Sequence, residues 1–241
     1  MRLQFLGSGN AFAPMGRGWS CFLVDGKYLF DCGPQALASL KRLQVDMGEI
    51  DAVFLTHFHA DHWLGIPFLF LEYDEITKRT RPLEIIGPPG VEELVEDIYE
   101  RVYFKRRARV TFERIYTPVH AGQRGDAAGI SFLSLPMNHA KEKLRAFGYR
   151  AQIHGQVLGY TGDTSWCDEV PRLGEGADVV VVDSTYPGDG RDNTHMGFND
   201  ARRLRPMLDE KTKLILTHLA VAPSEALPNT VAAEDFATYE V

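Results

Sequence analysis

The chain has 241 residues, of which 44% are hydrophobic, and its 26 Lys and Arg against 33 Asp and Glu give a formal net charge of −7. This size suits a globular protein with a substantial core, and the acidic balance argues against a protein that binds nucleic acid through charge alone. The three cysteines, Cys21, Cys32 and Cys167, lie too far apart to suggest a disulfide framework, and no apolar run is long enough to span a bilayer. We therefore expect a soluble cytoplasmic protein with no signal peptide and no membrane contact.

Short apolar runs bounded by turn residues predict strands, in chain order, at Arg2–Leu6, Cys21–Val24, Lys27–Phe30, Ala52–Leu55, Leu83–Ile86, Val110–Ile115, Ile130–Leu135, Gln156–Tyr160, Val179–Val182 and Lys213–Leu216. Longer amphipathic segments predict helices at Pro34–Val45, His62–Leu71, Val91–Phe104, Asp168–Leu173 and Asn199–Leu208. No linker-like or low-complexity stretch separates these elements. The pattern predicts an α/β (α+β) fold with αββα layers, in a single domain over residues 1–241.

Two of the predicted strands carry no polar alternation. Ala52–Leu55 and Val179–Val182 are continuous apolar runs, which are typical of strands buried on both faces with helices outside them. The dipeptide Asp25-Gly26 separates two other strand-like runs and predicts a tight hairpin.

Basic residues gather in three short runs, which we interpret as solvated faces rather than tracks for phosphate. These runs are Lys78-Arg79-Thr80-Arg81, Lys105-Arg106-Arg107-Ala108-Arg109 and Arg202-Arg203-Leu204-Arg205.

The most informative motif follows the predicted strand at Ala52–Leu55. The segment His57-Phe58-His59-Ala60-Asp61-His62 places three imidazoles and one carboxylate within six positions. Imidazole and carboxylate are the ligands that zinc and similar divalent metals take most readily. A histidine-rich surface loop is the alternative, but the density of ligands favours a metal site.

Further polar residues stand where other apolar runs end. Asp31, Asp163, Asp183 and His218 each follow a predicted strand, as His57 does. Because ligands in open α/β folds collect at strand ends, we expect these distant residues to share one pocket.

Each of these residues also has a simpler interpretation when it is taken alone. His139 and His218 would more often be buried histidines with ordinary hydrogen bonds, and Asp163 could cap a following helix. Asp31 is predicted to be structural, holding loop amides or orienting a ligand histidine from behind. Because the same chain contains the HxHxDH segment, we favour the metal-binding interpretation for His139, Asp163 and His218.

Taken together, these pieces resemble the ribonuclease Z-like branch of the metallo-β-lactamase fold family. The matching segments, in the family's order, are Phe5-Leu6-Gly7-Ser8-Gly9, Phe30-Asp31-Cys32-Gly33, the HxHxDH segment, Pro136-Met137-Asn138-His139, Tyr160-Thr161-Gly162-Asp163-Thr164 and Thr217-His218. The resemblance implies a four-layer αββα sandwich, with two mixed sheets flanked by helices.

The resemblance also implies two divalent metal ions per chain, most readily Zn²⁺, with Mn²⁺ or Fe left open. The residues that it assigns to one ion are His57, His59 and His139, those that it assigns to the other are Asp61, His62 and His218, and the bridge is Asp163. A hydroxide between the ions would be the nucleophile, and Asp61 would also orient it.

His195 and Asp183 take a catalytic role by the same resemblance. A histidine at the corresponding place in the family protonates the leaving oxygen, and an acidic residue orients it. By that match His195 would be the general acid and Asp183 its partner, although the family more usually has Glu at the position of Asp183.

One feature of the family is absent from this sequence. Ribonuclease Z enzymes that trim precursor tRNA carry a long flexible arm beyond a Gly-Tyr pair resembling Gly148-Tyr149, whereas here only Arg150–Val157 follows before the next strand. We therefore expect a metal-dependent phosphodiesterase acting on a small diester or on RNA, with no stable nucleic-acid partner evident and a homodimer left open.

Two other functions remain open at this point. A hydrolase of lactones, thioesters, β-lactams or sulfate esters could use the same two-metal site, and His195 would then be dispensable. A non-catalytic metal-binding protein would require closed coordination around its ions.

Overall fold

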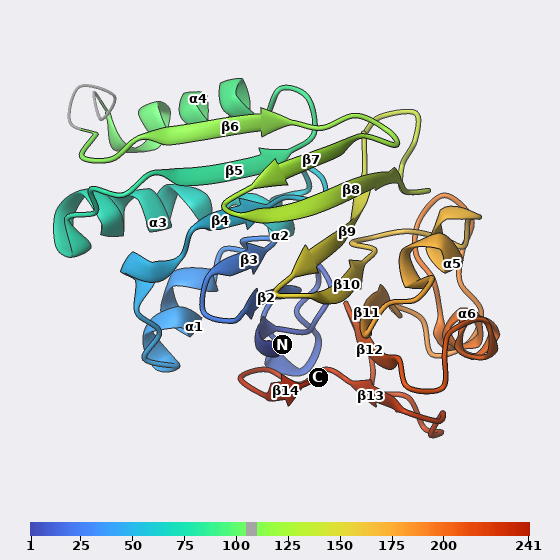
Figure 1. The fold of residues 1–241 in the computed structure, drawn as a ribbon. Helices are drawn as coiled ribbons and strands as arrows, with labels where there is room; N and C mark the ends of the chain where they lie inside the picture. The colour runs from blue at the N-terminus through green and yellow to red at the C-terminus, as the bar shows by residue number, and fades with distance from the viewer. Residues whose placement is uncertain (105–109) are drawn as a thin grey trace.

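The computed structural model describes residues 1–104 and 110–241, so the basic run at 105–109 lies outside the described residues. Two seven-stranded sheets pack face to face and carry helices on their outer faces, which confirms the predicted αββα layers (Figure 1). Among the described residues, no helix is both long enough and apolar enough to cross a membrane.

The first sheet has the strand order β14-β1-β2-β3-β4-β5-β6. Its strands are β1 (Arg2–Gly7), β2 (Cys21–Val24), β3 (Tyr28–Phe30), β4 (Ala52–Phe54), β5 (Leu83–Gly87), β6 (Arg114–Pro118) and β14 (Thr238–Glu240). The neighbours from β3 to β6 run parallel, whereas β14, β1, β2 and β3 pair antiparallel.

The second sheet has the order β13-β12-β11-β10-β9-β8-β7. Its strands are β7 (Arg124–Ala127), β8 (Ile130–Pro136), β9 (Phe147–Ile153), β10 (Gln156–Tyr160), β11 (Val179–Asp183), β12 (Lys213–Thr217) and β13 (Thr230–Ala232). Here β10 to β13 run parallel, so each sheet contributes a parallel half with its carboxyl ends at one edge.

Helices cover the outer face of each sheet. The helices α1 (Ala36–Arg42), α3 (Ile66–Glu72) and α4 (Val91–Tyr103) pack on the first sheet, and α5 (Glu169–Gly174) and α6 (Phe198–Leu204) pack on the second. The shorter helical pieces are η1 (Pro14–Gly16), η2 (Met47–Glu49), α2 (Ala60–Trp63), η3 (Tyr73–Thr77) and η5 (Arg205–Met207). The two strands without polar alternation, β4 and β11, are buried throughout, as their continuous apolar runs predict.

An aromatic row dominates the layer between the sheets. The rings of Phe22, Phe30 and Phe54 stack across β2, β3 and β4, with centroids 5.1 and 4.9 Å apart. Tyr160 of the second sheet meets the Phe22 ring edge-on at 5.0 Å. Offset and edge-on contacts of this kind stabilise a core beyond the area that they bury.

Several predicted boundaries differ from the structure for local reasons. The predicted helix His62–Leu71 is interrupted because Gly65 lies against the backbone of Gly33, where a Cβ would come within 2.2 Å of the Gly33 carbonyl oxygen. The predicted strand Val110–Ile115 is wrong over its first half, because Thr111 donates to the Asp74 carboxylate and pairing starts at Arg114. The predicted helix Asn199–Leu208 gives way at Arg205 to the 3₁₀ turn η5, which contains a proline.

The two hairpins show how turn residues set register. The predicted tight turn at Asp25-Gly26 is a three-residue connection that includes Lys27, because Val24 pairs with Tyr28. A two-residue turn joins β9 and β10 instead, with His154 and Gly155 both at positive φ. This turn stands where the resemblance places the family's arm, so the arm is absent from the fold.

Four strands are missing from the sequence prediction, namely β7, β9, β13 and β14. The last two lie in the final segment of the chain, and each adds an edge strand to a different sheet. Their short runs carry too little apolar alternation to indicate pairing, which the neighbouring strands supply.

The prediction of solvated basic faces is wrong for two arginines. Arg79 and Arg205 are buried, and their guanidinium groups donate to backbone carbonyls such as those of Gly48 and Thr212. These contacts hold chain turns together, because a guanidinium presents five donors in a rigid fork.

Gly162 lies in the turn between β10 and Asp163, with a φ of +59°, and an added Cβ would fall 2.6 Å from the Thr56 Cβ. We expect Gly162→Ala to lower the free energy of unfolding by about 1–3 kcal/mol, because it combines a disfavoured backbone conformation with a collision. Urea unfolding measures the loss. Gly188→Ala is the control, since nothing lies within 4 Å of its added Cβ, and equal losses in the two variants would contradict the explanation.

Candidate metal and catalytic site

The strand-end residues come together at one edge of the two packed sheets. Asp31 and His57 follow β3 and β4 of the first sheet, and Asp163 and His218 follow β10 and β12 of the second. Asp183 ends β11. Contacts among these residues confirm the predicted convergence.

The HxHxDH segment changes conformation in its middle. His59 is extended, with φ −68° and ψ 143°, and the short helix α2 begins at Ala60. The turn carries Asp61 and His62 around to a different side of the site from His57, as the spacing predicts. His57 and His62 are fully buried, whereas His59 is exposed.

Asp163 lies between two groups of imidazoles. Its Oδ2 faces the Nε2 atoms of His57 and His139 at 3.7 and 3.8 Å. Its Oδ1 faces the Nε2 atoms of His62 and His218 at 3.3 and 3.4 Å. Because no helix begins until Glu169, the alternative of a helix cap at Asp163 is wrong.

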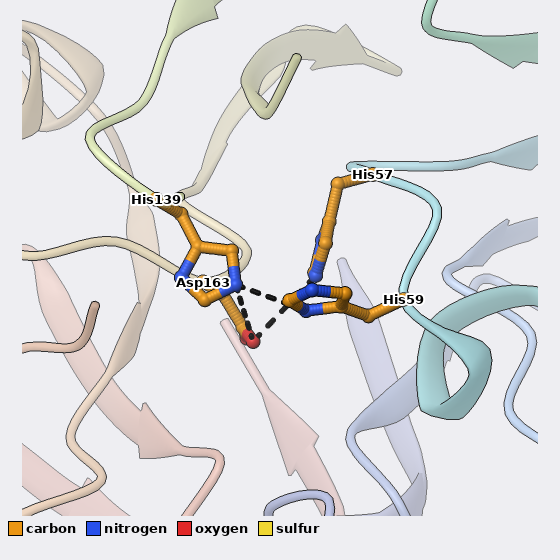
Figure 2. Close-up of side chains that lie close together, drawn as sticks. All are labelled: His57, His59, His139 and Asp163. Carbon is orange, nitrogen blue, oxygen red and sulfur yellow. Dashed lines mark hydrogen bonds and ion pairs between the residues drawn. The ribbon is translucent and has the colours of Figure 1, made fainter. Parts of the chain in front are cut away.

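Figure 2 shows the first group, in which His57, His59 and His139 converge on Asp163. Their potential ligand atoms all lie within 4.8 Å of one another, and His139 Nε2 is 3.0 Å from His59 Nδ1. The second group consists of Asp61, His62 and His218, with Asp61 Oδ2 at 3.4 Å from His62 Nε2 and 3.6 Å from His218 Nε2.

Three buried nitrogen atoms in this site have no hydrogen-bond partner among the described residues. They are the Nε2 atoms of His57, His62 and His218. A buried polar atom without a partner is costly, so three that point at one carboxylate call for a further group between them. Tetrahedral zinc with bonds of about 2.0–2.1 Å separates its ligand atoms by roughly 3.3 Å, close to the spacings here, and the residues therefore fit divalent metal ions.

The opposite nitrogen of each imidazole is held from behind. His57 Nδ1 contacts the Thr56 hydroxyl at 3.0 Å, and that hydroxyl donates to Asp31. His62 Nδ1 contacts Asp31 directly at 2.8 Å. Such partners fix the ring orientation and leave the Nε2 lone pair free to bind a cation.

Asp183 repeats this arrangement on the second sheet. Its Oδ1 accepts a hydrogen bond from the Thr185 hydroxyl at 2.7 Å, and Thr185 in turn contacts His218 Nδ1 at 2.8 Å. Its Oδ2 lies 2.8 Å from His195 Nδ1. The Asp side chain therefore reaches His195, although it is shorter than the Glu that the family usually has there.

Sequence analysis missed Thr56, Thr185 and the Thr194 carbonyl, which accepts from His139 Nδ1 at 2.7 Å. The position of Thr56 directly before His57 is a signal that could have identified it. The contacts of Thr185 with His218 and of Thr194 with His139 gave no signal, because these histidines come from distant segments of the chain.

Asp31 acts as predicted, from behind the site. Its fully buried carboxylate accepts hydrogen bonds from the Thr56 amide at 2.8 Å and from the Tyr160 hydroxyl at 2.7 Å, and it also holds His62. Its φ of +56° is unusual for a residue other than glycine, and this bond network holds it there.

The charges of the site favour a cation. Burial opposes ionisation of Asp163, but the neighbouring His218 and His62 outweigh it and hold the pKa of that carboxyl well below its usual range. Burial lowers the pKa of His57, which keeps the imidazole neutral and able to donate a lone pair. Burial also opposes the charged form of His62, but Asp163 and Asp31 raise its pKa well above the usual range. A proton and a metal ion therefore compete for the same electrostatic environment.

His195 differs from the other histidines because it remains partly accessible, with 19% of its side chain exposed. Burial disfavours its charged form, but the hydrogen bond and the charge of Asp183 raise the pKa of His195 to about 9.

Asp163, Asp183, His195 and His218 also lie within ligand distance of one another. The Asp183 carboxylate is already engaged by His195, Thr164 and Thr185.

Comparison with known proteins identifies the class. The beta-lactamase superfamily domain matches residues 27–219, so the chain belongs to that superfamily. Ribonuclease Z from Methanothermobacter thermautotrophicus is 26% identical over 302 aligned residues, which cover 100% of this chain and 97% of the relative. The predicted resemblance to the ribonuclease Z-like branch is thereby confirmed.

Solved structures show the same fold. Human tRNase Z, short form, superposes with a TM-score of 0.78 at 22% identity, covering 100% of this chain and 99% of that chain. The metallo-beta-lactamase fold protein YhfI from Bacillus subtilis superposes with a TM-score of 0.75 at 21% identity, covering 99% of each chain. The fold is the metallo-β-lactamase fold.

Removing the Asp31 carboxylate should weaken both stability and metal binding. We expect Asp31→Ala to lower the free energy of unfolding by about 3 kcal/mol or more, because it leaves buried donors unsatisfied. Metal affinity should fall about 10–100-fold, because His62 loses its support. Chemical denaturation and competition with a chromogenic chelator measure the two effects. Glu93→Ala, an exposed change on α4, is the control, and an equal response from it would contradict the assignment.

Proposed function

We propose that this chain is a dinuclear metal-dependent phosphodiesterase of the ribonuclease Z-like type, formed by one hydrolase domain. The observation that carries the proposal is the division of the Asp163 carboxylate between two groups of histidines. A carboxylate with one oxygen toward each group suits a bridge between two ions, for which we propose zinc, with Mn²⁺ or Fe left open.

The proposed ligands follow from the two groups. His57, His59 and His139 would hold one ion, Asp61, His62 and His218 would hold the other, and Asp163 would bridge them. When bound, two such ions supply Lewis acidity and a hydroxide nucleophile near neutral pH. Asp61, ionised because the neighbouring His218 and His62 outweigh burial and lower its pKa, would accept a hydrogen bond from the attacking water and orient it.

His195 would act as the general acid. Its Nδ1 is engaged by Asp183, so its Nε2 is the nitrogen available to protonate a leaving oxygen. With a pKa of about 9 the imidazole is charged at neutral pH, as the acid role requires. A leaving alkoxide of a phosphodiester needs this proton, whereas hydrolysis of an activated carboxylic ester does not, and the pairing therefore favours phosphodiester substrates.

The substrate is proposed to be RNA or a small diester. Relatives named ribonuclease Z favour RNA. The alignment with the Methanothermobacter ribonuclease Z has 302 positions, whereas this chain has 241 residues. That relative therefore carries residues with no counterpart here. The short turn between β9 and β10 favours a substrate that needs no long arm.

The proposal is tested by metal analysis of the purified chain together with hydrolysis of bis(p-nitrophenyl) phosphate. We expect about two metal ions per chain, and removal of the metal by a chelator should abolish the diesterase activity until metal is restored. Asp163→Ala should lower both the metal content and the activity. A chain that binds fewer than about two ions, with no activity under any added divalent metal, would overturn the proposal.

The acid assignment is tested by His195→Ala on a diribonucleotide, whose leaving group is an alkoxide, and on bis(p-nitrophenyl) phosphate, whose p-nitrophenolate leaves without being protonated. We expect a loss of about 10²–10⁴-fold in kcat on the diribonucleotide and a much smaller loss on bis(p-nitrophenyl) phosphate. His154→Ala is the matched control, because that exposed histidine lies in the β9–β10 turn. Equal rates of wild type and His195→Ala on the diribonucleotide would remove His195 from the mechanism.

Asp183→Asn tests the acid role of His195 through the pH dependence of kcat. The variant loses the charge that raises the pKa of His195, so the protonated acid should be lost at lower pH than in the wild type. The alkaline limb of the kcat profile should therefore move to lower pH, while the His154→Ala profile stays in place. An unmoved limb would show that Asp183 does not set the protonation of the acid.

A further inference from the structure

A cavity of about 620 Å³ lies among the segments next to His139, and its lining combines cations with apolar side chains. Lys141 and Arg145 stand at its rim and are exposed, whereas Met137 and Phe147 are buried beneath them, with Leu144 partly covered. This volume lies within the range of small-molecule sites, which are mostly apolar with a few placed polar groups.

The cavity shares its walls with the proposed metal ligands. Lys141 follows His139 by two residues, and its amide donates to the Asn193 side chain at 3.0 Å, close to His195. Phe147 donates its backbone amide to the carbonyl of Thr56, the residue before His57, at 2.9 Å. The cavity is therefore built from the same segments that present His57, His139 and His195.

No carboxylate neutralises the two cations of this rim. Within residues 1–104 and 110–241, neither Lys141 nor Arg145 forms an ion pair, although the chain has an excess of acidic residues. Other cations in the described part of the chain, such as Lys143 and Lys211, also have no ion pair, but Lys141 and Arg145 line one cavity together. Cations without an ionic partner in the described part of the chain, beside a diester site, offer a place for a further phosphate.

We propose that this cavity is a nucleotide subsite for single-stranded RNA. A base would lie on the apolar floor of Met137, Leu144 and Phe147, and Lys141 and Arg145 would hold the phosphate next to the scissile bond. The inference rests on the proposed phosphodiesterase function.

RNA is favoured over an acidic peptide because the cavity combines cations at its rim with an apolar floor. A flat heterocycle covers apolar surface, and the adjacent phosphate satisfies the cations, so one nucleotide matches both parts. A peptide carboxylate would use the rim but would leave the floor without a matching group.

Fluorescence anisotropy with a 5′-labelled ten-nucleotide oligoribonucleotide tests the subsite on the full metal-loaded chain. We expect the double variant Lys141→Ala/Arg145→Ala to bind at least tenfold more weakly at 50 mM salt. Its slope of log affinity against log salt should flatten by about 0.7 for each phosphate that the variant no longer neutralises. An abasic oligomer of the same length should bind the wild type at least fivefold more weakly than the normal oligomer.

The control is Lys27→Ala/Lys211→Ala, which removes two charges at the opposite edge of the sheets, before β3 and β12 begin. This control should bind within twofold of the wild type. Equal weakening in both double variants would indicate general attraction and overturn the subsite, as would an abasic oligomer that binds as tightly as the normal one.

Catalysis separates this inference from the proposed function. Hydrolysis of bis(p-nitrophenyl) phosphate, which has no flanking nucleotide, tests the proposed function alone. A wild type that hydrolyses this diester but does not bind the oligomer overturns only the subsite. A wild type that binds the oligomer through Lys141 and Arg145 but hydrolyses no diester overturns the proposed function and supports the subsite.

Discussion

The site depends on two buried carboxylates that hold its histidines from behind. Asp31, at the end of β3, contacts His62 directly and His57 through Thr56. Asp183, at the end of β11, contacts His195 directly and reaches His218 through Thr185. Each sheet thus contributes one anion that fixes two imidazoles. Because a buried carboxylate must be fully hydrogen-bonded, these contacts also fix the positions of the strands that carry them.

The same arrangement explains the direction of each ring. An imidazole whose Nδ1 is held by an acceptor presents the lone pair of Nε2, and for His57, His62 and His218 that atom has no other partner among the described residues. These lone pairs surround the Asp163 carboxylate, and together they favour a positive charge between the histidines and Asp163. His195 lies at the margin of this set, where its side chain remains partly exposed.

Prediction from sequence succeeded for features that are set by residues close together in the chain. The buried strands β4 and β11 show uninterrupted apolar runs, and the HxHxDH segment brings its imidazoles and carboxylate together through a turn within six residues. It failed where the cause lies in distant residues. The edge strands β13 and β14 are paired by β12 and β1, Arg79 is buried by carbonyls of other segments, and the break at Gly65 follows from contact with Gly33.

The sequence by itself determined the class of fold, the proposed ligand residues and the absence of the family's arm. The order of the motifs and the number of residues between them can be read directly from the chain. Only the tertiary structure decided that Asp163 divides its two oxygens between separate histidine groups, and that Asp183 is long enough to reach His195. It also brought Lys141 and Arg145 to one cavity with Met137 and Phe147. These facts depend on how two sheets align their carboxyl ends, and that alignment results from packing between residues far apart in the chain.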